Sequence, residues 1–445
     1  MNALEIIGRK RDGDANSPEE IRHLLGGYVD GSVPDYQMAA WLMAVCVRGM
    51  NAEETLDLTR AMVESGETLD LGAIPGIKVD KHSTGGVGDT VTLVATPLAA
   101  ACGVPVPKLS GRALGHTGGT IDKLESVPGV TCDLEPDRFI EQVRRIGIAI
   151  GAQSPRMVPA DKAVYALRDA TATVPSLPLI ASSVMSKKIA AGADAIVLDV
   201  KFGRGAFMPD LDDAAALART MVEIGEGAGR RTVALVTAMD EPLGRSVGDA
   251  LEVLEAERVL AGEGDLRLAE VAIAVAEEMC RLSGVDADPA AVLARGAGRE
   301  RFWDLLEAQG GERERRPVAH PVRLTVRATA DGWVGAVDAL QVGLAVHDIG
   351  GGRLRKGDDV DHGSGFTIEA RVGDRVRRGD ALVHVHAGSE EVARRALPRL
   401  EDAWRIRSRP VTPEPHVRRR VTVSGEESER EPAVAGAVPR RSRRR

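Results

Sequence analysis

The first 70 residues combine polar and apolar positions in the pattern of successive amphipathic helices, which is clearest between residues 17 and 65. Ser17-Pro18-Glu19-Glu20 is typical of a helix start, because a serine cap precedes a proline in the first turn. Asn51-Ala52-Glu53-Glu54 marks the start of another helix. The chain is therefore predicted to begin as a helical bundle.

After Gly72 the pattern changes. Short apolar runs, such as 104–109 and 195–200, alternate with glycine-rich turns and helical stretches, which is typical of an α/β sheet domain. A second helical passage near 161–191 interrupts this pattern, so the chain is predicted to leave the sheet, rejoin the helical bundle and return. The two domains are then discontinuous in sequence: residues 1–70 and 161–191 form the helical domain, and residues 71–160 and 192–316 form the α/β domain.

A charged, glycine-containing segment at 300–317 marks a further boundary. Beyond it, β-type runs alternate with Asp/Gly turns, so residues 317–423 are predicted to form a smaller α+β domain that is mostly β and lipoyl-like. No lysine stands in the tight hairpin that a carrier domain requires, which argues against a carrier function. Residues 424–445 are rich in Glu, Ser, Pro and Arg and are predicted to be a disordered tail without a catalytic role. The chain as a whole is assigned to the α/β class.

Composition narrows the possible functions. A chain of 445 residues is long enough for two or three domains with separate apolar cores. Its net charge of −8 and 3% aromatic content argue against nucleic-acid binding, which needs basic and stacking side chains. Residues 1–14 lack the long apolar segment of a signal peptide or membrane span. The four cysteines are widely spaced in the sequence and form no C-x-x-C pair, so we expect them to be reduced thiols. We expect a cytoplasmic protein that binds neither nucleic acid nor membrane.

The strongest local feature is a glycine-rich loop at 78–90, KVDKHSTGGVGDT, followed by an apolar helical run at 91–101. Such a loop points backbone N–H groups at an anion, and its glycines permit positive φ and close approach. Lys81 adds positive charge, and Ser83 and Thr92 add hydroxyl donors. The pattern indicates a phosphate cradle, although glycine-rich turns before helices also occur for purely steric reasons.

A second loop of this kind, KLSGRALGHTGGT at 108–120, follows an apolar strand and opens a helical stretch. Ser110 and Thr120 can supply further hydroxyl groups. Two such loops in one α/β domain are predicted to converge at the carboxyl edge of the sheet, where open α/β folds bind ligands. Neither loop has the G-x-x-x-x-G-K-[ST] pattern or the dinucleotide spacing, so free or singly esterified phosphate fits better than a nucleoside triphosphate or NAD.

The second helical passage contains a candidate base-binding cluster. Arg168 precedes Ser183 and Lys187, which are four residues apart and so share one helix face. A guanidinium, a hydroxyl and an ammonium that converge would match the C=O, N–H, C=O edge of a pyrimidine. Spacing alone does not distinguish this arrangement from a solvated helix face.

Longer motifs resemble a known family. The passage SGRALGHTGGTIDKLE at 110–125 closely resembles the signature of thymidine and pyrimidine-nucleoside phosphorylases. The match extends through KVDKHSTGGVGD, YALRDATATV, ASSVMSKK, MDEPLGRSVGDALEVLEA and DIGGGRLRKGDDVDHGSGF, and so covers nearly everything before the tail, which has no counterpart. The resemblance implies a homodimer in which a helical, nucleoside-binding domain is hinged to a mixed α/β, phosphate-binding domain.

The resemblance also assigns site residues. The phosphate-binding positions correspond to Lys81, His82, Ser83, Thr92, Lys108, Leu109, Ser110 and Thr120. The base-binding positions correspond to Arg168, Ser183 and Lys187. The positions of a potassium site in bacterial members correspond to Gly88, Thr90, Leu243, Ser246 and Glu255. No organic cofactor is expected.

The reaction that the resemblance implies is phosphorolysis of a pyrimidine nucleoside. Phosphate attacks the anomeric carbon as the base departs, which gives α-ribose or α-deoxyribose 1-phosphate with inversion and without a covalent enzyme intermediate. The expected catalytic residues are His82, Arg168 and Lys187, the last two because they would stabilise negative charge on the departing base. His82 either hydrogen-bonds or protonates the base, or only supports the loop.

Three alternatives remain open. The enzyme is either restricted to thymidine or accepts uridine as well, and Lys108 before the Leu109-Ser110 pair favours the broader range. A phosphoribosyltransferase of the anthranilate type shares a similar fold and loop, but it needs clustered carboxylates for Mg²⁺-pyrophosphate, and no matching acidic motif stands near the base-binding helix. A nucleoside sensor would keep the pocket and lose the chemistry, against which the retained Lys81 and Arg168 argue.

Overall fold

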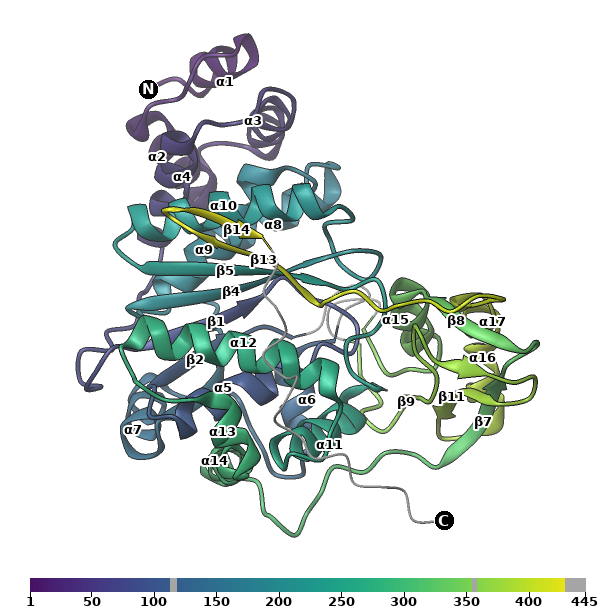
Figure 1. The fold of residues 1–445 in the computed structure, drawn as a ribbon. Coiled ribbons are helices and arrows are strands. Elements are labelled where there is room, and N and C mark those ends of the chain that lie inside the picture. The colour runs from purple at the N-terminus through teal and green to yellow at the C-terminus, as the bar shows by residue number, and fades with distance from the viewer. Residues whose placement is uncertain (113–117, 354–357, 429–445) are drawn as a thin grey trace.

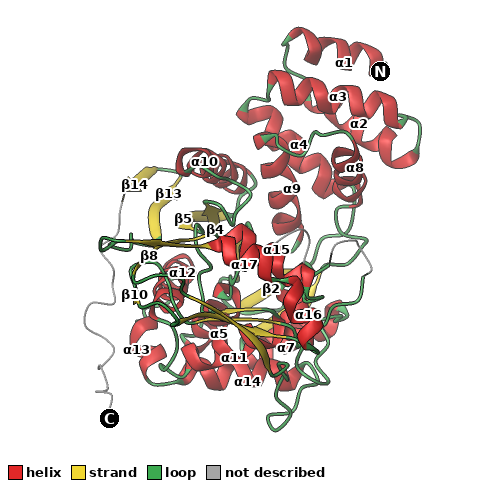
Figure 2. Cartoon of the chain, turned by 90° about the vertical axis from the view of Figure 1, so that its right-hand side faces the viewer, coloured by secondary structure: helices red, strands yellow, loops and turns green. Residues whose placement is uncertain are grey.

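The structure of the chain is a computed structural model that describes residues 1–112, 118–353 and 358–428. Figures 1 and 2 show a helical domain at one end, a central sheet covered by helices, and a smaller domain beside that sheet. Part of the second glycine-rich loop, 113–117, and most of the C-terminal tail lie outside the described residues.

The helical domain is built from two separate stretches of chain. Its helices are α1 (Ala3–Asp12), α2 (Pro18–Asp30), α3 (Asp35–Arg48), α4 (Ala52–Glu64), α8 (Pro159–Ala170) and α9 (Leu177–Ala190). The predicted helix starts at Ser17 and Asn51 are confirmed, because each residue closes a capping box with a glutamate three positions later. Trp41 from the first stretch and Leu179 from the second belong to the same buried cluster.

The α/β domain contains a central sheet and a separate two-stranded sheet, both packed against helices. Its elements are β1 (Val79–Ser83), α5 (Val91–Ala101), β2 (Val106–Ser110), α6 (Thr120–Glu125), α7 (Pro136–Ile146), β3 (Ile148–Ala152), β4 (Ala195–Phe202), α10 (Leu211–Gly227), β5 (Arg231–Ala238), β6 (Ser246–Val247), α11 (Asp249–Leu260), α12 (Leu266–Ser283), α13 (Pro289–Ala294) and α14 (Ala297–Ala308). Strands β1, β4 and β5 are parallel neighbours, and β2 pairs in parallel with β3. A hydrogen bond of 3.0 Å from Val79 N to Pro105 O joins β1 to the start of β2.

Alternate residues of β4 enter different cores. Val197 belongs to the cluster that includes residues of α5 and α12, whereas Leu198 belongs to the cluster that includes residues of α10. Every residue of β4 is buried, as expected of a central parallel strand covered on both faces. The polar residues at its carboxyl end therefore lie inside the protein.

The third domain mixes strands with helices. It contains β7 (Val322–Arg327), β8 (Gly332–Val337), α15 (Ala339–Asp348), β9 (Gly365–Ile368), β10 (Arg375–Val376), β11 (Ala381–His386), α16 (Glu390–Arg395), α17 (Leu397–Ala403) and β12 (Trp404–Arg407). One of its sheets, in the order β6-β9-β11-β7, includes β6 from the α/β domain. This shared sheet fastens the two domains together.

The C-terminal boundary differs from the prediction. Strands β13 (Val417–Thr422) and β14 (Gly425–Ser428) do not belong to the third domain or to a disordered tail. They extend the central sheet in the order β1-β4-β5-β13-β14, with β13 antiparallel to β5. The unpaired edge of β5 accounts for this, because an exposed strand edge presents N–H and C=O groups that a returning segment can satisfy.

None of the helices in the described ranges is long and apolar enough to cross a membrane.

We predict that His416, at the entrance to β13, makes stability depend on pH. Burial, reinforced by Arg371 and Arg267, lowers its pKa from 6.5 to about 3. The unfolded chain therefore binds a proton near pH 6.5 that the folded chain does not, so stability is full above that pH and is lost as the pH falls. The unfolding free energy should drop by about 2 kcal/mol between about pH 7.5 and about pH 5 on account of this residue.

Urea unfolding of the wild type and of His416→Gln at both pH values measures this contribution. Between these two pH values, the unfolding free energy of the variant should fall by about 2 kcal/mol less than that of the wild type. Equal pH dependence in the two proteins would contradict the assignment.

Candidate active site

The site is centred on β1, whose side chains alternate between the two faces of the sheet. Lys81 faces α5, where its Nζ lies 3.2 Å from Thr92 Oγ1. Asp80 faces the other way, and its Oδ2 accepts a 2.8 Å hydrogen bond from Lys188 Nζ of α9. One short strand thus brings groups of the α/β domain and of the helical domain close together.

The first glycine-rich loop closes on itself and on β4. Ser83 Oγ donates a 2.6 Å hydrogen bond to Asp89 Oδ2 and accepts one of 3.2 Å from Gly85 N. Gly85 has a φ of 97°, which favours glycine and allows this turn. Thr84 N donates to Asp199 O at 3.1 Å, so the loop is held against the end of β4.

The second loop begins beside the first. Lys108 Nζ donates to Leu109 O at 2.9 Å, and Lys188 Nζ reaches the same carbonyl at 2.7 Å. Lys108 is also 3.9 Å from Asp80. Ser110 at the end of β2 and Thr120 at the start of α6 are both half-buried. The structure therefore brings the start of the second loop to β1, although residues 113–117 lie outside the described part of the chain.

The cationic surroundings set the charge of the titratable groups. Burial, together with Lys188, Lys108, Lys81 and Lys187, lowers the pKa of His82 well below its usual 6.5. Its imidazole is therefore neutral near pH 7, which favours a hydrogen-bonding or supporting role over proton donation by an imidazolium. Burial alone would raise the pKa of Asp89, but Lys201, Lys81 and Lys123 lower it below its ordinary value.

The candidate base-binding residues are mostly buried. Only 1% of Arg168 is exposed, and its guanidinium donates to the carbonyl groups of Thr173, Val174 and Leu179 at 3.1, 2.6 and 3.1 Å. Ser183 is 7% exposed. Burial therefore excludes a solvated helix face for Arg168 and Ser183, whereas the Lys187 side chain is 33% exposed. Arg168 supports the turn between α8 and α9, a role that spacing had not suggested.

Lys187 has three acceptors within reach. Its Nζ lies 2.9 Å from Ser183 O and 3.0 Å from Ser183 Oγ, and it forms an ion pair with the buried Asp161. An ammonium group has three N–H donors, so contact with a ligand requires at least one of these bonds to open. Asp161 also acts on the pKa of Arg168, where burial lowers the value and this carboxylate raises it. Asp161 thus links the two cationic residues.

Sequence reasoning missed the anionic half of the site. Asp80, Asp161 and Asp199 bind the lysines, and none of them stands at a spacing that identifies its partner. Lys201 and Lys188 were also missed as functional candidates. The pairs of Asp80 with Lys188, of Asp161 with Lys187 and of Asp199 with Lys81 join residues that are remote in the sequence, so only the strand order and the packing of the helices reveal them.

The five residues of the predicted potassium site also come together. Gly88 O accepts hydrogen bonds from Thr90 N at 3.2 Å and Gly244 N at 3.1 Å. Both carboxylate oxygens of Glu255 accept backbone N–H groups, from Arg245 at 2.7 Å and Ser246 at 2.9 Å. The Leu243 carbonyl accepts a 2.8 Å bond from Arg371, and Thr90 Oγ1 donates to Glu252 at 3.0 Å.

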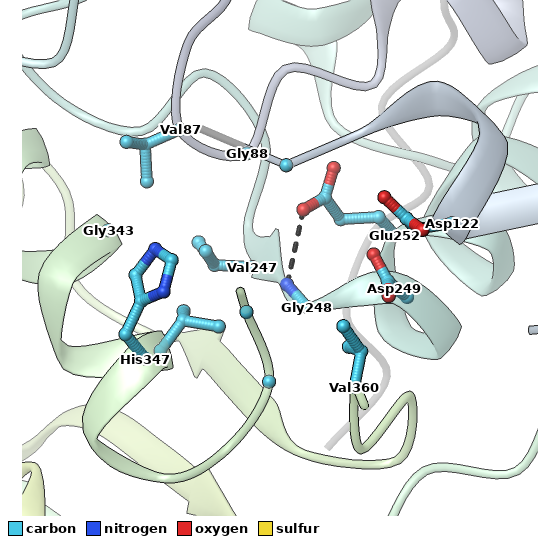
Figure 3. A pocket seen from close by; sticks show the side chains of 14 residues that line it. Val87, Gly88, Asp122, Val247, Gly248, Asp249, Glu252, Gly343, His347 and Val360 are labelled. Carbon is cyan, nitrogen blue, oxygen red and sulfur yellow. Dashed lines mark hydrogen bonds between the residues drawn. The ribbon is translucent and has the colours of Figure 1, made fainter. Parts of the chain in front are cut away.

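A pocket lies on the far side of the first loop, between the α/β domain and the third domain (Figure 3). Asp122, Asp249 and Glu252 line one side of it, and His347 lies on the other side. Gly248 N donates to Glu252 Oε1 at 3.1 Å. Each of these carboxylates is paired within the protein, Glu252 with Lys123, Asp122 with Arg353 and Asp249 with His362, so this pocket offers no free cation for phosphate among its lining residues. The lysine-rich region around β1 suits phosphate instead.

Three family models match the chain. The glycosyl transferase family α/β domain matches residues 76–297, and the helical bundle domain of the same family matches residues 4–66. The pyrimidine nucleoside phosphorylase C-terminal domain matches residues 333–407. The helical bundle model covers the first stretch of the helical domain, the α/β model covers the sheet domain together with α8 and α9, and the third model covers most of the smaller domain.

Curated relatives and one solved structure agree with these matches. The chain is 49% identical to a pyrimidine-nucleoside phosphorylase of Geobacillus stearothermophilus over 409 residues, which cover 88% of this chain and 93% of the relative. It is 48% identical to the enzyme of the same name from Bacillus subtilis over the same shares of both chains. The crystal structure of an anthranilate phosphoribosyltransferase from Thermus thermophilus superposes with a TM-score of 0.54 at 23% identity, covering 69% of this chain and 98% of that one, which shows a shared fold only.

Proposed function

Because this chain belongs to the family of pyrimidine-nucleoside phosphorylases, we propose that it cleaves pyrimidine nucleosides with inorganic phosphate. The products are the free base and α-ribose or α-deoxyribose 1-phosphate, and the substrates include thymidine, deoxyuridine and uridine. One observation carries this proposal: β1 presents Lys81 and Ser83 to one face of the sheet and lies close to Lys187 and Lys188 on the other. An anion and a base can therefore be held close together.

The two faces of the sheet at β1 have different roles in this reaction. Lys81, Ser83, Ser110 and Thr120 hold phosphate with ammonium and hydroxyl donors on the sheet domain. Lys187 and Ser183 face the base, where Lys187 stabilises the negative charge that grows on the base oxygens as the glycosidic bond breaks. Arg168 shapes this half of the site by fixing the turn after α8. The neutral imidazole of His82 lies among these lysines and hydrogen-bonds to a substrate without changing its own charge.

Initial rates of base release from thymidine, deoxyuridine and uridine, with and without inorganic phosphate, test the proposed function. We expect release from all three nucleosides, and only when phosphate is present. Release that requires phosphoribosyl pyrophosphate would point to the transferase instead. Nucleosides that stay intact although they bind would point to a sensor, and release from thymidine alone would narrow the substrate range.

Two variants separate the two halves of the site. Lys187→Ala removes the ammonium that faces the leaving base, so turnover should fall by about 100-fold or more while phosphate affinity stays the same. Ser110→Ala should instead weaken phosphate binding by about tenfold, the effect of losing one hydrogen bond to a charged group. Steady-state kinetics and isothermal titration with inorganic phosphate measure both quantities. Weaker phosphate binding with normal turnover in Lys187→Ala would contradict the division.

We also propose a potassium site formed by Gly88, Thr90, Leu243, Ser246 and Glu255. Its support is the Glu255 carboxylate, 2% exposed, whose pKa burial raises to about 7 with help from Asp265 and Glu252. A monovalent cation beside it would offset that buried negative charge, and the nearby carbonyl oxygens are suitable ligands. Bound potassium would hold the first glycine-rich loop against the segment 243–246.

Thermal unfolding in KCl, NaCl and choline chloride at equal ionic strength tests this site. A cation that binds only the folded state stabilises it by about 2.7 kcal/mol at a hundredfold excess over its Kd, so unfolding should occur at the highest temperature in KCl. Glu255→Gln should remove most of the difference between the salts. Identical unfolding of the wild type in all three salts would contradict the site.

We propose further that the enzyme is a cytoplasmic homodimer that associates through α1 and α3. These packed helices expose apolar side chains, among them Tyr36 at 74% and Val47 at 72%, as surfaces that bind partners do. All four cysteines are free, as expected in a reducing compartment. Sedimentation velocity should give a dimer for the wild type and a monomer when Tyr36 and Val47 are replaced by lysine. A monomeric wild type would contradict this interface.

A further inference from the structure

Two buried charged residues near the phosphate half of the site have no role in the reaction described above. Asp199 and Lys201 are two residues apart near the end of β4, so they project from the same face of the sheet. Both are 0% exposed. The strand register places Asp199 opposite Ser83 of β1 and Lys201 opposite Thr237 of β5.

These residues form a chain of charges between the two phosphate-binding groups of β1. Asp199 Oδ2 lies 3.2 Å from Lys81 Nζ and 2.9 Å from Lys201 Nζ. Lys201 Nζ is in turn 3.7 Å from Asp89 Oδ1, and Asp89 Oδ2 accepts the hydroxyl proton of Ser83. The order is therefore Lys81, Asp199, Lys201, Asp89, Ser83. Lysines and carboxylates alternate along it.

The ammonium group of Lys201 is poorly satisfied for a structural lysine. Within the described residues its Nζ has ion-pair neighbours but makes no hydrogen bond, and the same holds for Asp199 Oδ2. A buried ammonium without hydrogen bonds costs stability, because contact with water is lost without full replacement. Its ion pairs with Asp199 and Asp89 do not use all three N–H donors in hydrogen bonds, so the ammonium group can take a further acceptor.

The hydroxyl group of Ser83, in contrast, already donates its hydrogen bond within the protein. A serine hydroxyl carries one hydrogen, and here that hydrogen is donated to Asp89. Ser83 can donate to a phosphate oxygen only after Asp89 releases it. On the other side of the Asp89 carboxylate lies Lys201, whose Nζ is 3.7 Å from Asp89 Oδ1 and makes no hydrogen bond to it.

We propose that Lys201 is a positioning residue for phosphate, an inference that rests on the proposed function. When phosphate reaches the loop, the Asp89 carboxylate moves from Ser83 onto Lys201, and the Ser83 hydroxyl then donates to phosphate. Asp199 stays between the two lysines, where Thr237 Oγ1 fixes its other oxygen at 2.6 Å. Lys201 does not touch phosphate itself. Instead, Lys201 pairs with the Asp89 carboxylate after phosphate has displaced it from Ser83.

The experiment compares Lys201→Met and Lys201→Arg with the wild type by isothermal titration with inorganic phosphate and by steady-state kinetics. In Lys201→Met the affinity for phosphate should fall, and its KM rise, by about tenfold or more, as expected for the loss of one hydrogen bond to a charged group. The KM for the nucleoside and the turnover at saturating phosphate should change little. Lys201→Arg should restore most of the phosphate affinity.

Lys10→Met is the matched control. Lys10 is also a buried lysine, 3% exposed and 2.6 Å from Glu54, but it lies in α1 of the helical domain, away from β1. It reports what the loss of a buried paired lysine costs in thermal stability alone. Phosphate affinity should stay unchanged in this variant.

Double-variant analysis tests the route through Ser83. Ser83→Ala removes the hydroxyl that Lys201 is inferred to release, so Lys201→Met should weaken phosphate binding much less in that background than in the wild type. Fully additive effects would overturn the proposal, as would a Lys201→Met variant that is less stable but binds phosphate normally. If Lys201→Met does not fold, Lys201→Gln takes its place with the same expected result.

The titrations use phosphate alone, so they remain decisive if the wild type proves inactive on nucleosides. That outcome would reject the proposed function and leave the inference about Lys201 to be judged by binding.

Discussion

The structure depends on keeping lysine side chains charged and buried at the carboxyl ends of β1 and β4. Lys81 and Lys201 are fully buried, and each lies within 3.2 Å of Asp199. Taking charged groups out of water is costly, and removing one member of such a pair leaves the other unpaired. The phosphate half of the site is therefore a balanced set of opposite charges. In our proposal, an incoming phosphate rearranges this set of charges.

The same strand connects the site to the helical domain. Asp80 and Lys81 face opposite sides of β1, and the Asp80 carboxylate accepts a hydrogen bond from the ammonium group of Lys188 in α9. Lys188 also donates to the carbonyl of Leu109, so a single side chain of the helical domain joins β1 to β2. The preceding residue on α9, Lys187, is the one that we propose to face the base. In this proposal, adjacent lysines serve attachment and chemistry, and a movement of α9 would alter both.

Much of this arrangement was predictable from local signals. The caps at Ser17 and Asn51, the apolar helix after the first loop and the strand before Ser110 are all local features, and they lie where the sequence places them. The return of the chain as β13 was not predictable, because its partner β5 lies about 180 residues earlier and its own pattern resembles that of the third domain. The carboxylate partners were equally hidden. Asp161 binds Lys187 because α8 and α9 pack together, and the sequence interval between them carries no sign of it.

The central claim is that phosphate, held by Lys81 and the nearby hydroxyl groups, is the group that takes the sugar from the base. Phosphorus-31 NMR of a reaction containing thymidine and inorganic phosphate tests it directly. The account predicts a new signal from α-deoxyribose 1-phosphate that grows in step with free thymine as the signal of inorganic phosphate declines. Thymine that accumulates while inorganic phosphate remains unchanged would show hydrolysis, and would contradict the claim.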